Sequence, residues 1–182
     1  NTFEGKDIKF IFVDDGSKDG SSKWLNDNLK EIFNKENFEL NILKKNHGKG
    51  YAIRKGLERS TENKILITDG DLELDSIELK KLMILDKTKN VNLAFGSRKN
   101  ITELKTIWNY GNYLLTYIFN LRNRSKLSDA LCCAISFYKN DISITSLQSN
   151  SFDIDVELKQ HLIRKEYLIS IIPLLYKRRN TI

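Results

Sequence analysis

The chain has 182 residues and a mass of 21.2 kDa, which is enough for one well-buried domain and short for two. Hydrophobic residues make up 40% of the sequence and charged residues 30%, a composition that excludes an intrinsically disordered chain. The formal net charge of +6 suits an anionic partner such as a nucleotide, a lipid phosphate or an acidic membrane surface. The basic residues are scattered, whereas a nucleic-acid partner requires them clustered with aromatics, so we expect no nucleic acid.

Short β-rich runs alternate with helical periodicity along the chain. The nearly continuous apolar run over 8–13 predicts a buried strand that ends in a glycine-containing turn. Further strands are predicted over 40–43, 65–68, 91–95, 132–138 and 168–172, and helices around Leu29, around Leu57, after a cap at Ser76, and over 107–121 and 155–164. We therefore expect one α/β domain, 1–182, with a mostly parallel sheet flanked by helices.

The cysteines indicate the compartment. Cys132 and Cys133 are adjacent, and a disulfide between them would be strained because neighbouring strand residues point to opposite faces. No secretory signal is visible, and no apolar run reaches the ~18 residues of a membrane span. We expect two reduced, buried cysteines and a cytoplasmic protein.

The strongest chemical motif is the run Thr-Asp-Gly-Asp-Leu-Glu at 68–73, where a predicted strand ends in alternating carboxylates. Carboxylate oxygens are ligands of Mg²⁺, which usually takes one or two of them together with substrate phosphates. An EF-hand calcium loop is excluded, because its glycine and glutamate positions hold Leu74 and Lys80. Read alone, the motif fits equally an acidic turn before the helix that begins near Ser76.

Two further motifs lie at predicted strand ends or helix starts. Asp14 and Asp15 can accept hydrogen bonds from a base or ribose, although a plain glycine-rich turn has the same composition. The loop at 46–50 places two glycines and Lys49 before a helix, as a phosphate cradle or a simple helix entry would. Its spacing is not that of a P-loop. In open α/β sheets such strand ends share one edge with the 69–71 motif and with Arg98.

The order of these motifs is more specific than any one of them. A Val-Asp-Asp-Gly-Ser strand end at 13–17 is followed by Asn-His-Gly-Lys-Gly-Tyr-Ala at 46–52 and by Asp-Gly-Asp at 69–71. In this order, and with Gly-Ser-Arg at 96–98, the chain resembles the family 2 glycosyltransferases of the Rossmann-like GT-A fold. The resemblance extends over essentially the whole chain. It is strongest to the branch of dolichyl-phosphate mannose and glucose synthases and bacterial polyprenyl-phosphate sugar transferases.

The resemblance implies roles for the donor side of the site. Asp14 or Asp15 would contact the nucleoside of a UDP- or GDP-hexose, and Lys49 would lie in the nucleotide pocket. Asp69 and Asp71 would hold Mg²⁺ or Mn²⁺ on the diphosphate, with Glu73 as a further ligand, and the metal would stabilise the leaving group.

It also implies an acceptor side. Arg98, a permanent bidentate cation, would bind an acceptor phosphate together with Arg178 near the end of the sequence. The alternatives are a surface or salt-bridged arginine for Arg98 and a solvated terminal charge run for Arg178. Asp129 would be the catalytic carboxylate beside the acceptor, and Glu157 either orients the site or is a solvated helical glutamate. The terminal basic residues and an aromatic helix could meet a membrane at its cytoplasmic face, although core packing is the commoner role of such aromatics; these aromatics are Trp108, Tyr110, Tyr113, Tyr117 and Phe119.

The leading hypothesis is an inverting, metal-dependent transfer of a hexose to a polyprenyl phosphate. One alternative is a family relative that extends a surface polysaccharide on a sugar hydroxyl, and another is a non-catalytic domain that binds nucleotide sugars. A fourth hypothesis is a nucleotidyltransferase, which also uses metal-binding carboxylates on an α/β sheet. Compared with the family pattern, the sequence opens at Asn1 inside the connection to the second strand, so we expect the first strand to be missing.

Overall fold

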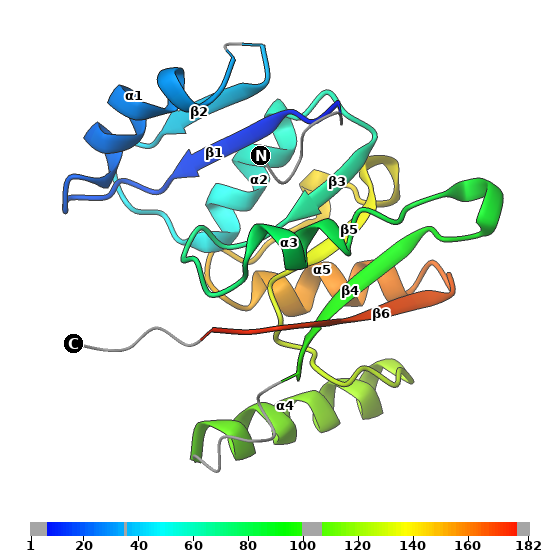
Figure 1. Cartoon of the computed structure of the whole chain (residues 1–182). Coiled ribbons are helices and arrows are strands. Elements are labelled where there is room, and N and C mark those ends of the chain that lie inside the picture. The colour runs from blue at the N-terminus through cyan, green and yellow to red at the C-terminus, as the bar shows by residue number, and fades with distance from the viewer. Residues whose placement is uncertain (1–6, 35, 100–106, 178–182) are drawn as a thin grey trace. The chain divides into compact units, whose positions relative to one another are not determined.

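The computed structural model describes residues 7–34, 36–99 and 107–177 (Figure 1). These residues form two compact units. The first contains the residues up to 62 together with 143–157, and the second contains 63–142 and the residues from 158 onward. Each unit has its own sheet, and no strand pairs across them among the described residues.

The first unit is built on a parallel strand pair. Strand β1 (Phe10–Asp14) pairs with β2 (Phe38–Ile42), with Phe10 opposite Phe38. Helices α1 (Ser21–Ile32) and α2 (Lys49–Arg59) follow the two strands, and the short helix η4 (Ile144–Ser146) belongs to the same unit. Phe33, just after α1, packs its ring against Phe10 and Phe12 at centroid distances of 4.9 and 5.6 Å. This aromatic contact joins helix and strands, so β1 delivers Asp14 to a fixed position.

The second unit has a four-stranded sheet in the order β3-β5-β4-β6. Its strands are β3 (Lys64–Ile67), β4 (Leu93–Arg98), β5 (Ile135–Tyr138) and β6 (Ile169–Leu174). Strand β5 runs antiparallel to both neighbours, whereas β4 and β6 are parallel. The expected predominance of parallel pairing is therefore not found among the described strands. Periodicity locates a strand but does not give its direction.

The helices of the second unit are α3 (Ser76–Lys80), α4 (Ile107–Asn123), η1 (Lys87–Lys89) and η3 (Lys139–Asp141), while α5 (Ile154–Ile163) contributes residues to both units. Asp75, and not Ser76 as expected, caps α3: its carboxylate accepts from the Ile77 N–H. Asp is as good a cap as Ser, so the sequence alone does not choose between neighbours.

Helix α4 differs from its expected burial. Phe119 is in the core, but Tyr110, Tyr113 and Tyr117 are 72%, 76% and 60% exposed, so core packing is wrong for these three tyrosines. Among the described residues, no helix is long and apolar enough to cross a membrane. The expected burial of the cysteines is confirmed for Cys132, while Cys133 is half-buried, and both are free thiols.

Gly96 marks the tightest point of the second core. A Cβ on Gly96 would lie 2.6 Å from Cδ1 of the fully buried Leu174 and 3.0 Å from the Ala134 carbonyl oxygen. The Gly-Ser-Arg motif therefore begins with a glycine because β4 packs closely against its neighbours here.

Gly96→Ala is expected to lower the free energy of unfolding by about 1–3 kcal/mol, since the added methyl overpacks a closed core. The matched control is Gly111→Ala in α4, where a Cβ meets nothing within 4 Å. That change should stabilise the helix by about 0.5–1 kcal/mol. Urea unfolding measures both, and equal effects would contradict the packing argument.

Candidate active site

Asp14, at the end of β1, organises the turn that follows it. Its buried carboxylate accepts from the Ser17 N–H at 3.3 Å and the Ser17 hydroxyl at 2.5 Å, and also from the Ser22 hydroxyl. Burial alone would raise the pKa of Asp14, but the hydrogen bonds from the two serines lower it below its ordinary value. Asp14 is therefore an ionised anchor of its own loop, and its contact with a nucleoside stays a prediction.

Asp15 connects two of the sequence motifs. Its carboxylate oxygens accept from the backbone N–H groups of His47 and Gly48 at 2.9 and 2.7 Å. Gly16 next to it has φ +73°, and a Cβ there would lie 2.5 Å from the Lys45 carbonyl carbon, so only glycine fits. The structure thus brings the loops after β1 and β2 together, as expected for neighbouring parallel strands.

Lys49 begins α2 and is engaged within the first unit. Its Nζ lies 2.6 Å from Oδ2 of Asp155, and both side chains are largely buried. The two flanking glycines have a packing reason: a Cβ on Gly48 or Gly50 would come within 2.2 Å of the carbonyl oxygens of residues 150 and 149. The conformation of the loop at 46–50, which the sequence analysis interpreted as a phosphate cradle or a helix entry, is therefore partly determined by packing against residues 149–150.

Glu157 holds that segment in place. Its two carboxylate oxygens accept from the N–H groups of Gln148 and Ser149, both at 2.9 Å. Arg54 of α2 adds hydrogen bonds to the Ser149 carbonyl and the Asn150 side chain. Glu157 is half-buried and bound to the backbone, so it is not a freely solvated glutamate, and its role in orienting the site stays a prediction.

The carboxylate loop, residues 69–73, lies in the second unit directly after β3. The Glu73 N–H donates to Oδ1 of Asp71 at 3.1 Å, and Leu72 between them has φ +62°. Burial raises the pKa of Asp71, and the charges of Glu73 and Asp69 raise it further. Three carboxylates are thus close enough to repel one another.

This donor set fits a hard divalent cation, because a cation would relieve the mutual repulsion of the oxygens. Within the described part of the chain, no group of three or more His, Cys, Asp or Glu side chains is arranged to hold a metal unaided. Magnesium sites commonly complete their coordination with substrate phosphates. The loop is therefore suited to a metal that it shares with a diphosphate.

Tyr176 closes the loop from the other side. Its hydroxyl donates to Oε2 of Glu73 at 2.6 Å. Burial and this bond to a carboxylate raise the pKa of Tyr176 to about 12, so it is a protonated donor at neutral pH. The resemblance, which extends over essentially the whole chain, includes Tyr176, but the sequence indicated no partner for it.

Arg98 and Asp129, predicted separately for the acceptor side, form an ion pair. The Arg98 Nε lies 2.7 Å from Oδ2 of Asp129, and the Arg98 Nη2 lies 2.9 Å from Oδ1 of Asp129. The guanidinium therefore donates to both carboxylate oxygens. Burial would raise the pKa of Asp129, but the hydrogen bonds and charge of Arg98 lower it below its usual range. The pair is a rigid, largely desolvated unit at the end of β4.

Lys159 of α5 supports the same turn and was not singled out from the sequence. It is fully buried, and its ammonium donates to the carbonyl oxygens of Ala130 at 2.9 Å and Cys132 at 2.6 Å. The charge of Lys159 adds to the lowering of the Asp129 pKa. A lysine in a helical pattern resembles a surface residue, so no local signal marks it. Arg178, the other predicted phosphate ligand, lies outside the described residues.

The sequence and fold agree with known proteins. The sequence model described as Glycosyl transferase family 2 matches residues 1–145, and the chain belongs to this family. A dolichyl-phosphate beta-glucosyltransferase of Saccharomyces cerevisiae is 26% identical over 193 residues, which cover 93% of this chain and 57% of that protein. The corresponding human protein is 29% identical over 81% of this chain and 49% of its own length. The chain thus spans about half the length of the curated relatives that it matches.

Solved structures show the same fold. Glucosyl-3-phosphoglycerate synthase of Mycobacterium tuberculosis superimposes with a TM-score of 0.65 at 17% identity, covering 94% of this chain and 61% of that one. Its complex with Mn²⁺, UDP and glucosyl-3-phosphoglycerate gives a TM-score of 0.64 at 14% identity, over 95% and 61% of the two chains. The expected α/β GT-A fold is therefore confirmed.

We predict that the Arg98–Asp129 ion pair raises the free energy of unfolding at neutral pH and that this contribution is lost in acid. Because the folded pKa of Asp129 is lowered, the contribution is present above the unfolded pKa near 4 and is lost as pH falls through the folded pKa. Asp129→Asn should cost about 3 kcal/mol at pH 7, since it removes the buried counter-charge of a guanidinium that is largely out of water.

Urea unfolding between pH 7 and pH 3 tests this prediction. The gap between wild type and Asp129→Asn should narrow below about pH 4. Asp27→Asn, which alters an exposed carboxylate of α1, serves as the control and should follow wild type throughout. A gap that is constant with pH would show that the charge of Asp129 is not the stabilising feature.

Proposed function

We propose that residues 1–182 form the catalytic domain of an inverting glycosyltransferase that moves a hexose from a UDP- or GDP-sugar to a polyprenyl phosphate. The observation that supports it is the composition of the second unit, which contains both the carboxylate loop and the Arg98–Asp129 pair, with Tyr176 in contact with each. Relatives named dolichyl-phosphate beta-glucosyltransferase and dodecaprenyl-phosphate galacturonate synthase support the acceptor class.

Each candidate residue has a distinct part in this proposal. Asp69, Asp71 and Glu73 would hold Mg²⁺ or Mn²⁺, whose charge stabilises the diphosphate leaving group. Asp14, Asp15 and Lys49 belong to the loops assigned to the nucleotide. Arg98, with Arg178, would orient the acceptor phosphate, and a single displacement by that phosphate inverts the configuration of the sugar carbon.

The state of Asp129 favours a phosphate acceptor over a sugar hydroxyl. A hydroxyl nucleophile needs a general base whose pKa lies near the working pH. Asp129 has a lowered pKa and both of its oxygens face Arg98, so it is a poor base. A phosphate is already ionised and needs no proton removed, so Asp129 would act by holding Arg98 in its orientation.

Donor binding tests the metal assignment. Thermal shifts of the full-length protein are measured with UDP-, GDP- and dTDP-hexoses, each with and without Mn²⁺. One nucleotide class should stabilise the protein only with metal, and Asp71→Asn should abolish the shift because it removes a ligand charge.

Asp86→Asn is the matched control. The Asp86 carboxylate accepts from an N–H two residues later, just as that of Asp71 does, but it lies in the turn before β4. This variant should keep the full shift. A metal-dependent shift that survives Asp71→Asn, or none with any nucleotide, contradicts the donor assignment. Binding without hexose transfer to dolichyl phosphate would support the non-catalytic alternative.

The proposal includes contact of α4 with the cytoplasmic face of an anionic membrane. Exposed tyrosines and aliphatic residues line the helix, and no acidic residue occurs over 107–128. Three exposed basic residues follow at the helix end. Aromatic and apolar side chains beside cations are typical of helices that lie in a membrane interface. The basic residues are Arg122, Arg124 and Lys126.

Vesicle flotation tests this contact. The protein should bind phosphatidylglycerol-containing vesicles, and changing Arg122, Arg124 and Lys126 to serine should weaken binding by about 1 kcal/mol per residue. Neutral phosphatidylcholine vesicles serve as the control for charge, and a triple serine variant of Lys18, Lys23 and Lys30 serves as the control for net charge. Equal losses in both triple variants would contradict a role specific to α4.

A further inference from the structure

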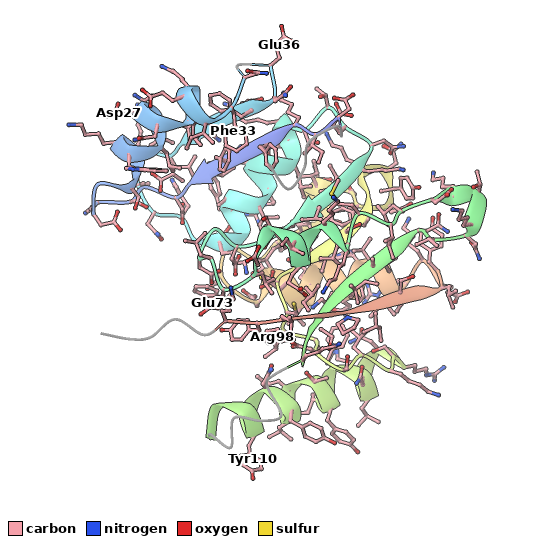
Figure 2. The ribbon with its side chains drawn as sticks, viewed as in Figure 1. Asp27, Phe33, Glu36, Glu73, Arg98 and Tyr110 are labelled. Carbon is pink, nitrogen blue, oxygen red and sulfur yellow. The ribbon has the colours of Figure 1, made fainter. Side chains whose placement is uncertain are left out.

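Tyr176 touches both sides of the candidate site in the second unit. Its hydroxyl donates to Glu73 of the carboxylate loop at 2.6 Å. Its ring faces Arg98, whose guanidinium carbon lies 5.5 Å from the ring centroid. Strand β6 ends at Leu174, two residues before Tyr176. Glu73 and Arg98 both lie near this end of the strand (Figure 2).

The backbone fixes the position of this ring. Tyr176 forms an antiparallel bridge with Leu74, and the Lys177 N–H donates to the Glu73 carbonyl oxygen at 2.8 Å. The Leu175 N–H donates to the buried carboxylate of Glu78 at 2.7 Å. Three consecutive residues are thus fastened to the carboxylate loop and to the helix that follows it.

The register between β4 and β6 determines the contact between Arg98 and the ring of Tyr176. In the parallel pairing of β4 with β6, Arg98 lies opposite Leu174. The chain then leaves β6 and brings Tyr176 beneath the guanidinium, whose plane is already held by Asp129. The aromatic face attracts a cation, and the attraction grows when the cation is desolvated.

We propose that Tyr176 is a positioning residue that fixes Glu73 with its hydroxyl for metal binding and Arg98 with its ring for the acceptor phosphate. The proposal rests on the proposed function. A hydrogen bond to a metal-ligating carboxylate sets its orientation, and losing such a partner typically weakens metal affinity 10- to 100-fold. One side chain would therefore align the donor and acceptor groups with each other.

The hydroxyl is tested by Tyr176→Phe, which keeps the ring. Mn²⁺ binding to the full-length protein is measured with UDP or GDP present, because the loop is suited to a metal shared with a diphosphate, and the readout is the electron paramagnetic resonance signal of unbound Mn²⁺. The dissociation constant should rise about 10-fold. Tyr167→Phe is the matched control, because it removes another tyrosine hydroxyl that bonds a carboxylate, Asp141, at 3.1 Å in the same unit. It should bind Mn²⁺ as wild type does.

A double-mutant cycle shows whether the hydroxyl acts through Glu73. In a Glu73→Gln background, Tyr176→Phe should cause no further loss of Mn²⁺ affinity, since the shared partner is already altered. Additive losses would contradict the coupling. Circular dichroism and thermal unfolding of each variant establish that it is folded before affinity is compared.

The ring is tested by comparing Tyr176→Leu with Tyr176→Phe. With dolichyl phosphate as acceptor, the KM for the lipid should rise roughly tenfold in the leucine variant and stay unchanged in the phenylalanine variant. If the leucine variant does not fold, Tyr176→Met, which also removes the aromatic face, takes its place and should show the same rise in KM. An unchanged KM in a folded variant without the ring would contradict the role of the ring.

The outcomes separate this inference from the proposed function. If Mn²⁺ binds wild type but not Asp71→Asn, while Tyr176→Phe binds it as tightly as wild type or more tightly, the positioning role is overturned and the metal site stands. If wild type itself does not bind Mn²⁺ with either nucleotide present, both the metal assignment and the role of Tyr176 are overturned.

Discussion

The buried ion pair between Arg98 and Asp129 is the interaction on which the second unit depends. Removing two charges from water is costly, and the cost is recovered only when geometry and further hydrogen bonds are good. Here both carboxylate oxygens face the guanidinium, and the ammonium of Lys159 binds the carbonyls of the turn that carries Asp129. Both oxygens of Asp129 are thus engaged by Arg98, and the proposed chemistry therefore uses a nucleophile that needs no base.

The sequence predicted the positions of the helices and strands well, but it did not predict the direction in which strands pair or the residue that caps a helix. Apolar runs and helical spacing placed every strand and helix named from the sequence close to its observed position, because burial imposes a period of two or of 3.6 residues. The motif order also identified the fold before any geometry was known. The antiparallel direction of β5 and the cap of α3 were not predictable, since neither depends on the apolar pattern.

For the candidate site, the sequence likewise predicted individual residues but not the residues that they contact. Asp15, Asp71 and Arg98 were predicted as candidates because strand ends expose polar side chains at a sheet edge, and their roles stay predictions. The partners that fix these and the other candidate residues come from distant parts of the chain: Asp155 is 106 residues from Lys49, and Glu73 is 103 residues from Tyr176. No local pattern reports such contacts. Lys159 is the clearest case, because a lysine in a helix is usually solvated and this one is fully buried.

The polar side of α4 contacts the turn that carries Asp129, the residue that the proposal places beside the acceptor. Thr116 accepts from the Ala130 N–H at 3.1 Å, and Asn120 exchanges two hydrogen bonds with the Leu127 backbone at 2.8 and 2.9 Å. The helix therefore holds the turn that carries Asp129, while its tyrosines face outward. If those tyrosines lie in a membrane interface, the turn and Arg98 are held at a fixed depth relative to lipid headgroups. A lipid phosphate would then meet Arg98 without leaving the surface, whereas a soluble sugar hydroxyl would gain nothing from this connection.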